Sequence, residues 1–462
     1  MSRINGIIIF LLLFTGCTIG PKYIRPDVPI PEKYKEDWKI AEPQDRQLKG
    51  EWWQIFNDPQ LNALEDEVNI SNQNIAAAQA QYAEAYALVQ AAKSAFFPIL
   101  TTNGSYTDSH TATANGKAST SAQTLLNANV TWELDLWGKI RQTISSNKAQ
   151  AEASAADLEG VRLSAQAQLA QDYFSLCSLD MQKKILDDTL DIYRKFYDLT
   201  KNRHESGVAA ESDVLQAKTQ LEATDAQDVD IGVQRAQMEH AIALLIGRPA
   251  SDFSLPSSKL PGTVPFVPAG LPSSILERRP DIAAAERTVA SANALIGVAQ
   301  TAYFPTLTLS ASGGYESSAL SRLFESPNPF WSVGPALAET IFDAGLRQAQ
   351  TAQARAVYAQ DVANYRQAVL TAFQQVEDNL AALRILEHEQ GIQDTAVRDA
   401  DKSLALETDQ YKAGTVSALD VINTQAIALS NEKTDVTLLG ERMNAAVLLI
   451  EYLGGGWIVP KE

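Results

Sequence analysis

Residues 139–201 contain no proline and only one glycine, Gly160. Alanine, glutamine, leucine, aspartate and lysine dominate this run. Most of these residues favour or tolerate a helix, so nothing in the run predicts a break. We expect one helix over 138–201, which would be about 90 Å long at a rise of 1.5 Å per residue. A second run of the same kind occupies 345–411. Helices of compact domains rarely exceed about 20 residues, so two such rods predict a protein that spans a distance.

The chain repeats itself at a constant spacing of 207 positions. This spacing separates Pro98 from Pro305, Gly138 from Gly345, Gly207 from Gly414 and Asp213 from Asp420. Separate matches at one spacing indicate an internal duplication in which each half is one structural unit. We assign the first repeat to 59–248 and the second to 273–453, joined by a proline-rich linker at 249–272 and followed by a tail at 454–462.

Each repeat is predicted to contain a helix, two strands, the long helix, a turn and a return helix. Strands are indicated where apolar and polar residues alternate, as in 126–134, because successive side chains of a strand point to opposite faces. The expected strands are 99–108 and 123–135 in the first repeat and 306–315 and 330–342 in the second. The expected return helices are 212–247 and 418–453.

Alternating strands of this length suit a β-barrel of the outer membrane with a wet interior. The alternative is an amphipathic sheet lying on a soluble core, but the neighbouring sequence offers rods instead of such a core. A sheet in lipid must have no free edges, and the smallest membrane barrels have about eight strands. Four strands per chain therefore predict a cyclic oligomer, of which the residues alone allow two, three or four copies.

The first 16 residues have the features of an export signal. Arg3 supplies the positive charge, and a short apolar run at 7–14 leads to a Thr-Gly-Cys sequence that ends at Cys17. This ending resembles a bacterial lipobox, which predicts a lipoprotein signal peptide at 1–16 and a lipid on Cys17. The alternative is an ordinary signal peptide that is cut nearby. Residues 17–58 are expected to form an extended arm that begins at the lipidated cysteine.

The sequence offers little support for catalysis or for nucleic-acid binding. The net charge is −18, whereas phosphate binding needs clustered lysine and arginine. Four histidines are scattered without metal-ligand spacing, and we find no nucleophile elbow and no phosphate-binding glycine loop. We therefore expect no enzymatic activity and no metal or cofactor, apart from the covalent lipid on Cys17.

Both return helices carry an apolar seam with alternating steps of three and four, the spacing of a coiled coil. Each seam is interrupted by an aspartate and, seven residues later, by an arginine: Asp228 and Arg235 in the first repeat, Asp435 and Arg442 in the second. We interpret these residues as inter-helix polar pairs that fix register, or as a polar ring. The alternative is a solvated break in the stripe.

The sequence resembles the outer membrane factors of tripartite efflux systems, the TolC-like family, and most closely its NodT/OprM-like lipoprotein branch. The resemblance covers essentially the whole mature chain. It is carried by Cys17 to Tyr23, by Trp52-Trp53 with Asp58-Pro59, by Trp132 to Gly138, and by Leu271-Pro272 with Leu276 to Ile282.

This resemblance implies a mainly α fold with a transmembrane β-barrel. Three chains with four strands each would close a twelve-stranded barrel, and a long α-helical barrel with a small equatorial domain would cross the periplasm. The implied partners are two further copies of the chain, a periplasmic adaptor, an inner-membrane pump of the RND type and outer-membrane lipid. The implied function is an exit duct for small molecules such as drugs.

The resemblance also assigns roles to the two turns between long and return helices. It implies a gate at the periplasmic tip, formed by Arg203 and Asp213 in the first repeat and by Tyr411 and Asp420 in the second. The implied adaptor-docking residues are Gly207, Val208, Gly414, Thr415 and Ser417. Apart from the resemblance, a glycine is expected just past a helix end, and an aspartate near a helix start can simply complement the helix dipole.

Two other functions remain open at this stage. Within the duct class, type I protein secretion competes with small-molecule efflux, although the lipobox favours efflux. A lipid-anchored coiled-coil scaffold without a pore would explain the rods but leaves the amphipathic strands without a role.

Overall fold

The computed structural model describes residues 18–28, 30–31, 35, 50–112, 118–267 and 278–455. The predicted signal peptide, Cys17, and parts of the predicted arm, linker and tail lie outside these residues. The chain divides into two compact units. Unit 1 comprises Met1–Asp27, Ala80–Ala155 and Ala284–Gln367, and unit 2 comprises Val28–Gln79, Ala156–Ala283 and Ala368–Glu462.

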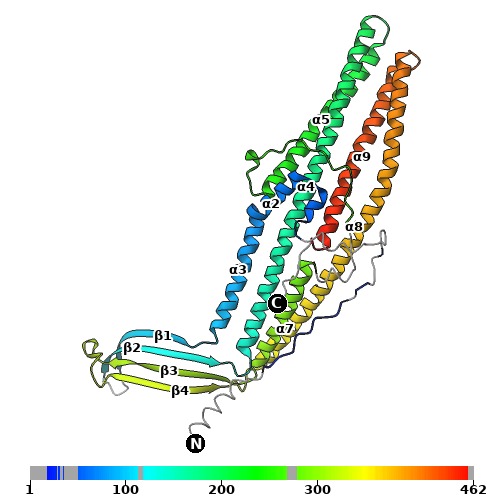
Figure 1. The fold of residues 1–462 in the computed structure, drawn as a ribbon. Helices are drawn as coiled ribbons and strands as arrows, with labels where there is room; N and C mark the ends of the chain where they lie inside the picture. The colour runs from blue at the N-terminus through cyan, green and yellow to red at the C-terminus, as the bar shows by residue number, and fades with distance from the viewer. Residues whose placement is uncertain are drawn as a thin grey trace. The chain divides into compact units, whose positions relative to one another are not determined.

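Unit 1 contains a four-stranded antiparallel sheet (Figure 1). Its strands are β1 (Ile99–Ala112), β2 (Ala118–Leu134), β3 (Thr306–Ser317) and β4 (Pro329–Ala338), and they pair in the order β1-β2-β3-β4. The two repeats meet in the middle of the sheet, where β2 of the first repeat pairs with β3 of the second. Within the described residues, β1 and β4 therefore each leave one edge of the sheet without a partner strand.

All four strands begin or end at least two residues away from the predicted limits, β3 only by extending to Ser317. β1 and β2 are longer at the hairpin between them, because antiparallel pairing continues as far as Ala112 opposite Ala118. β4 ends at Ala338 and not at 342. The residues that follow it prepare the next helix, since the Asp343 carboxylate accepts hydrogen bonds from the backbone N–H groups of Gly345 (3.0 Å) and Arg347 (3.2 Å).

Helices in unit 1 continue directly from the strands. α3 (Gln73–Ser94) precedes β1, α7 (Pro280–Thr301) precedes β3, and the long helices α4 (Lys139–Glu205) and α8 (Leu346–Lys412) follow β2 and β4. Only the parts of these helices that fall within Ala80–Ala155 and Ala284–Gln367 belong to unit 1. The repeats are joined beside the sheet by Trp137, whose indole N–H donates to the Pro305 carbonyl oxygen at 2.7 Å.

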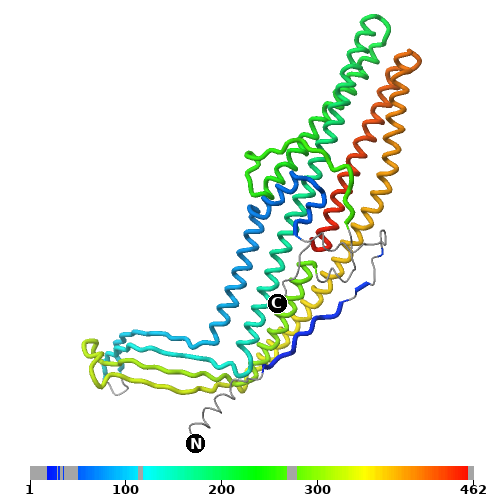
Figure 2. The backbone as a smooth tube through the Cα atoms, in the orientation of Figure 1, coloured from blue at the N-terminus to red at the C-terminus, as the bar shows by residue number. Residues whose placement is uncertain are grey.

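Unit 2 consists mainly of two helical hairpins, each a long helix that turns back into a return helix (Figure 2). α4 and α8 each have 67 residues, and the return helices α5 (Glu211–Leu245) and α9 (Ala418–Tyr452) each have 35. The unit also contains η1 (Trp52–Phe56), α2 (Pro59–Ser71) and η2 (Ala250–Asp252). Trp52, Tyr173 and Phe174 are among its largest fully buried side chains. In the described part of the chain, no helix has both the length and the apolar character needed to cross a membrane.

The first helix of the first repeat is broken at Asn72, which corrects the expectation of a single helix there. Asn72 has an extended ψ of 123°, and its side-chain oxygen accepts from the backbone N–H groups of Asn74 (2.9 Å) and Ile75 (3.1 Å). Its amide also donates to the Leu245 carbonyl at the end of α5 (2.8 Å). The break is therefore held both by a local helix cap and by a distant contact.

The same contact recurs 207 positions later, which shows the duplication in three dimensions. Arg279 occupies the position equivalent to Asn72, and its guanidinium donates to the Tyr452 carbonyl at the end of α9 (3.0 Å). Asn72 and Arg279 thus each connect the start of a helix to the last turn of the return helix in the same repeat. The duplicated unit has kept its geometry while its residues have changed.

Candidate functional site: the tips of the helical hairpins

Both hairpin tips turn through the same backbone motif. At the first tip the N–H of Val208 donates to the Arg203 carbonyl (2.8 Å) and that of Gly207 to the His204 carbonyl (2.8 Å). At the second tip Thr415 donates to Gln410 (3.0 Å) and Gly414 to Tyr411 (3.0 Å). This pair of bonds is a Schellman motif, which needs a left-handed residue at its glycine. Gly207 has a φ of 76° and Gly414 a φ of 77°, a conformation that other residues adopt only with strain.

The two tips differ in how the return helix begins. Ser417 and Asp420 form a capping box, in which Asp420 accepts from the Ser417 N–H (2.9 Å) and hydroxyl (2.7 Å) while the Ser417 oxygen accepts from the Asp420 N–H (3.4 Å). At the first tip Ala210 has no side-chain oxygen. Only half of the box remains there, the bond from the Ala210 N–H to Asp213 (3.3 Å).

The side chain of Asp420, which was predicted as a gate residue, thus caps the start of its own helix. The hydrogen bond from the Ser417 hydroxyl, followed by that from the Ser417 backbone, lowers the pKa of the Asp420 carboxyl below its ordinary value. The charged form that caps the helix is therefore favoured. Asp213 holds the equivalent position in α5.

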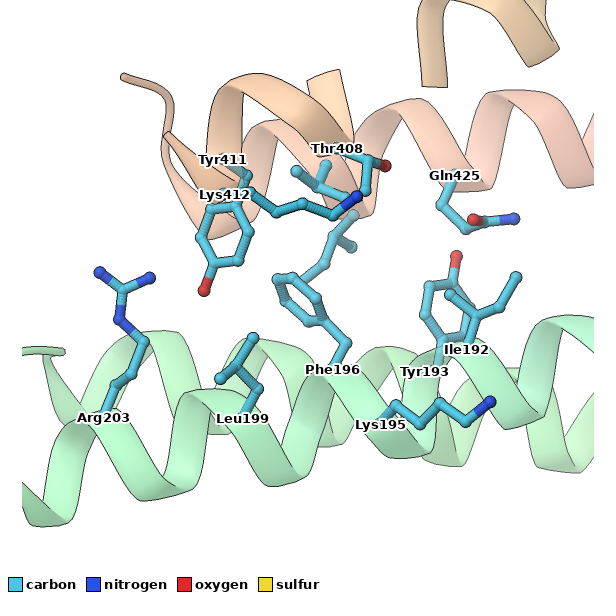
Figure 3. Close-up of a pocket in the computed structure, with 12 residues that line it drawn as sticks. Ile192, Tyr193, Lys195, Phe196, Leu199, Arg203, Thr408, Tyr411, Lys412 and Gln425 are labelled. Atoms are coloured by element: carbon cyan, nitrogen blue, oxygen red, sulfur yellow. The ribbon is translucent and has the colours of Figure 1, made fainter. Parts of the chain in front are cut away.

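Tyr411 and Arg203, from opposite hairpins, do come together. The Arg203 guanidinium carbon lies 5.3 Å from the centre of the Tyr411 ring, a cation–π contact, and the Phe196 ring lies 5.4 Å from that ring. Figure 3 shows Tyr411 reaching from α8 toward Leu199 and Arg203 of α4. The ring of Tyr411 is buried and ties the second hairpin to the first just before the tips.

A cavity of about 570 Å³ lies beside this contact (Figure 3). It is lined from α4 by Tyr193, Phe196 and Leu199, from α8 by Tyr411, and from α9 by Gln425, among others. Burial raises the pKa of Tyr193 to about 12, so its phenol stays neutral. The lining is mostly apolar.

Of the α4 residues that line this cavity, only Arg203 was predicted from the sequence. Ile192, Phe196, Leu199 and Arg203 recur at steps of four, three and four, which places them on one face of the helix. This stripe is a sequence signal for the cavity, although the turn that follows it carries the more recognisable motif.

The predicted seam residues form bonds with the long helices and not with each other. Asp228 accepts from Lys183 of α4 (2.8 Å), and Arg235 donates to Asp180 of α4 (2.7 Å). Asp435 accepts from the Gln390 amide of α8, and Arg442 lies 3.9 Å from Glu387 of α8. Each seam residue thus makes a polar contact between helices, and the seven residues that separate the aspartate from the arginine direct each side chain to a different turn of the facing helix.

The arm beyond Cys17 has a defined place in unit 1. The Ile19 N–H donates to the Trp137 carbonyl (3.0 Å), and the Gln142 side chain donates to the Ile19 carbonyl (3.2 Å). A Cβ on Gly138 would lie 3.2 Å from the Thr18 Cα. Farther along, Arg25 donates to the Tyr365 hydroxyl (3.0 Å). The arm is therefore fixed at the junction where β2 becomes α4.

In the described ranges, no group of three or more histidine, cysteine, aspartate or glutamate residues is arranged to hold a metal ion.

Comparisons with known proteins agree with this architecture. The family model described as "Outer membrane efflux protein" matches residues 64–248 and again 271–455, two matches offset by 207 positions. The cation efflux system protein CusC of Escherichia coli O6:H1 is 28% identical over 455 residues, covering 96% of this chain and 97% of the relative. The antibiotic efflux pump outer membrane protein ArpC of Pseudomonas putida is 28% identical over 454 residues, covering 96% and 93%.

A solved structure shows the same fold. The outer-membrane channel OprN is 29% identical to this chain, covers 96% of it with 100% of its own chain, and superposes with a TM-score of 0.89. The similarity thus includes both the sheet and the long helices.

Proposed function

Because the chain belongs to the outer membrane efflux protein family and is located in the outer membrane, we propose that it is the exit duct of a tripartite efflux system. In this proposal it passively passes small molecules from a periplasmic adaptor and an inner-membrane pump, of the RND type, to the outside. The names of its relatives include both cation and antibiotic efflux. The pump would select among such compounds, so the duct itself needs only a passage.

The observation that carries the proposal is the sheet with two open edges. Leu100 of β1 is 67% exposed, and Trp331 and Val333 of β4 are 79% and 72% exposed. Such apolar surface is unfavourable in water and favourable against lipid. Backbone groups at an open edge cannot remain unpaired in lipid, so β1 of one copy must pair with β4 of another. Three copies would give a closed barrel of twelve strands, an even number within the range of membrane barrels.

The arm supports a lipid anchor on Cys17. Thr18 and Ile19 lie at the junction between the membrane strand β2 and the helix α4. A lipid on the preceding residue would therefore start close to the level at which the sheet enters the bilayer. A single acyl chain alone binds membranes only weakly, so the anchor would supplement the barrel.

The tips would serve as the gate and as the adaptor-docking surface. Tyr411 and Arg203 connect the two hairpins of one chain, so separating them would let the second hairpin move. The exposed turns around Val208 and Thr415 would be available for docking. In the closed state the capping box would fix the shape of the second turn, with Asp420 acting through its own helix.

The other functions fit the molecule less well. A scaffold without a pore leaves the exposed apolar sheet unexplained. An exit duct for type I protein secretion would share the architecture, and only the efflux names of the relatives favour small molecules.

Cross-linking of the sheet edges tests the proposal. Cysteines are placed singly at Thr101, Asn103 or Ser105 of β1 and combined with one at Ser332, Gly334 or Ala336 of β4, in the intact lipidated protein. We expect at least one combination to yield covalent trimers on a denaturing gel after oxidation. The control pair Asn129→Cys and Ser312→Cys, which face each other across β2 and β3, must link within one chain. Monomers or dimers alone from every edge combination, with the control pair linked, would refute the closed trimer.

A further inference from the structure

The two hairpins use different polar contacts at equivalent positions. In the first hairpin, Lys183 of α4 bridges Asp187 of α4 (3.2 Å) and Asp228 of α5 (2.8 and 2.9 Å). The position 207 residues after Lys183 is Gln390, whose side-chain amide contacts Asp394 (3.3 Å) and Asp435. Both aspartates are thus kept in the second hairpin, while the cation between them is replaced by a neutral amide.

Without the lysine, the two carboxyl groups of the second hairpin meet directly. Asp394 of α8 and Asp435 of α9 both accept from the same Gln390 amide nitrogen, so their carboxyl groups are neighbours with no cation between them. Ionising both of two neighbouring carboxyl groups is unfavourable, which favours a proton on one of them. Burial, followed by the hydrogen bond and the charge of Asp394, raises the pKa of Asp435 above its ordinary value.

A second carboxyl pair lies farther toward the tip. Burial, followed by the charge of Asp401 of α8 and hydrogen bonding with it, raises the pKa of Glu432 of α9. The equivalent of Asp401 in the first hairpin is Arg194, again a cation replaced by a residue without positive charge. Two separate replacements therefore leave the α8–α9 contact with carboxyl pairs.

Neighbouring charges do not neutralise these pairs. From α4, Asp188 adds a further negative charge near Glu432. Lys433 of α9 is turned to α5, where it donates to Gln227 (3.4 Å). Arg442 faces Glu387, and Arg398 donates to the Thr395 hydroxyl (2.8 Å). Among the described residues, none of the four carboxyl groups has a lysine or arginine nitrogen within 4.0 Å.

We propose that shared protons hold the second hairpin together where ion pairs hold the first, so that the α8–α9 contact tightens in acid and loosens as the pH rises. The sign follows from the raised pKa values. The folded hairpin binds more protons than the separated helices, so its stabilisation is complete below the ordinary values of 3.8 for aspartate and 4.5 for glutamate. It is lost as the pH rises through the raised values, and the two carboxylates then repel each other.

The first hairpin responds in the opposite direction. Its hydrogen bond to Asp228 raises the pKa of Lys183, so the lysine stays charged at neutral pH. The ion pair weakens only when the aspartates become protonated in acid. Tyr411 and Asp420 both belong to the second hairpin. A rise in pH would therefore loosen the side of the tip that carries them and leave the first hairpin unchanged.

Hydrogen–deuterium exchange of the intact oligomer from pH 4.5, the ordinary pKa of glutamate, up to pH 8 tests this inference, with rates corrected for the intrinsic effect of pH. The α9 peptide 428–438 is compared with its equivalent in α5, 221–231. We expect the local opening constant of the α9 peptide to rise with pH, by about tenfold for each unit by which the pair's pKa is raised, and that of the α5 peptide to stay constant.

Two reciprocal variants make the test specific. Gln390→Lys supplies the missing cation and should reduce the pH response of the α9 peptide, whereas Lys183→Gln should create such a response in α5. As the pH rises, the infrared band of protonated carboxyl groups should disappear at a lower pH in Gln390→Lys than in the wild type. An α9 peptide without any pH response, or one whose response is the same in Gln390→Lys, would overturn the inference. Both results are independent of channel activity and so leave the exit duct unaffected.

Discussion

At the scale of single residues, Glu65 is a charged group placed where charge is unfavourable. Its side chain in α2 is fully buried, and neither carboxyl oxygen has a hydrogen-bond partner in the described structure. Burial, followed by the charge of Asp66, raises the pKa of Glu65 well above its ordinary value of 4.5. The folded state therefore holds the proton, and stability falls as the pH rises above 4.5.

We predict that Glu65→Leu raises the free energy of unfolding at neutral pH by about 1–3 kcal/mol, because it removes an unpaired buried polar group. Glu65→Gln should abolish the pH dependence while keeping the shape. Thermal unfolding in detergent at pH 5 and pH 8 measures both effects. A wild-type protein that is as stable at pH 8 as at pH 5, relative to Glu65→Gln, would show that Glu65 stays charged.

The contact between Tyr411 and Arg203 gives a second prediction at this scale. A cation–π contact of this kind contributes about 0.5–2 kcal/mol, and the tyrosine ring also packs on Phe196. Tyr411→Ala should therefore let the hairpins separate, whereas Tyr411→Phe keeps the ring and should behave like the wild type. Spin labels at the exposed positions 206 and 413 report the separation as a distance distribution. Equal distributions in the alanine and phenylalanine variants would contradict a role for the ring.

At the scale of elements, the two return helices begin with unequal caps. Ser417 completes a capping box in α9, whereas Ala210 leaves half of one in α5. Ala210→Ser should stabilise the first tip by about 0.5–2 kcal/mol, and Ser417→Ala should destabilise the second by a similar amount. Exchange rates of the amides in 209–215 and 416–422 measure the two effects. The exchange rates should change in opposite directions in the two variants. A change in the same direction in both would mean that the cap is not the cause.

The strands and long helices could be predicted from sequence because their signals are local. Alternation in 126–134 and the absence of proline from 139–201 need no knowledge of distant residues. The break at Asn72 could not be predicted, since it depends on a contact with the Leu245 carbonyl 173 positions away. The partners of the seam residues were missed for the same reason, because Lys183 and Asp180 belong to the facing helix.

At the scale of the whole molecule, the repeat explains why one chain cannot close a barrel by itself. Each half contributes two strands, and the resulting sheet keeps two open edges with exposed apolar residues. The family assignment, the arm beside Cys17 and the tips are all consistent with a duct closed by several copies. The resemblance to the family predicts three copies of the chain, a number that the residues alone do not determine.

Conductance across a planar lipid bilayer tests the central claim most directly. The purified, lipidated oligomer is added to one side at low protein concentration, and single insertions are recorded. The account predicts discrete current steps of uniform size, with Tyr411→Ala increasing the open fraction and Tyr411→Phe leaving it unchanged. Protein that inserts as a folded oligomer but gives no current steps in either the wild type or Tyr411→Ala would contradict the exit duct.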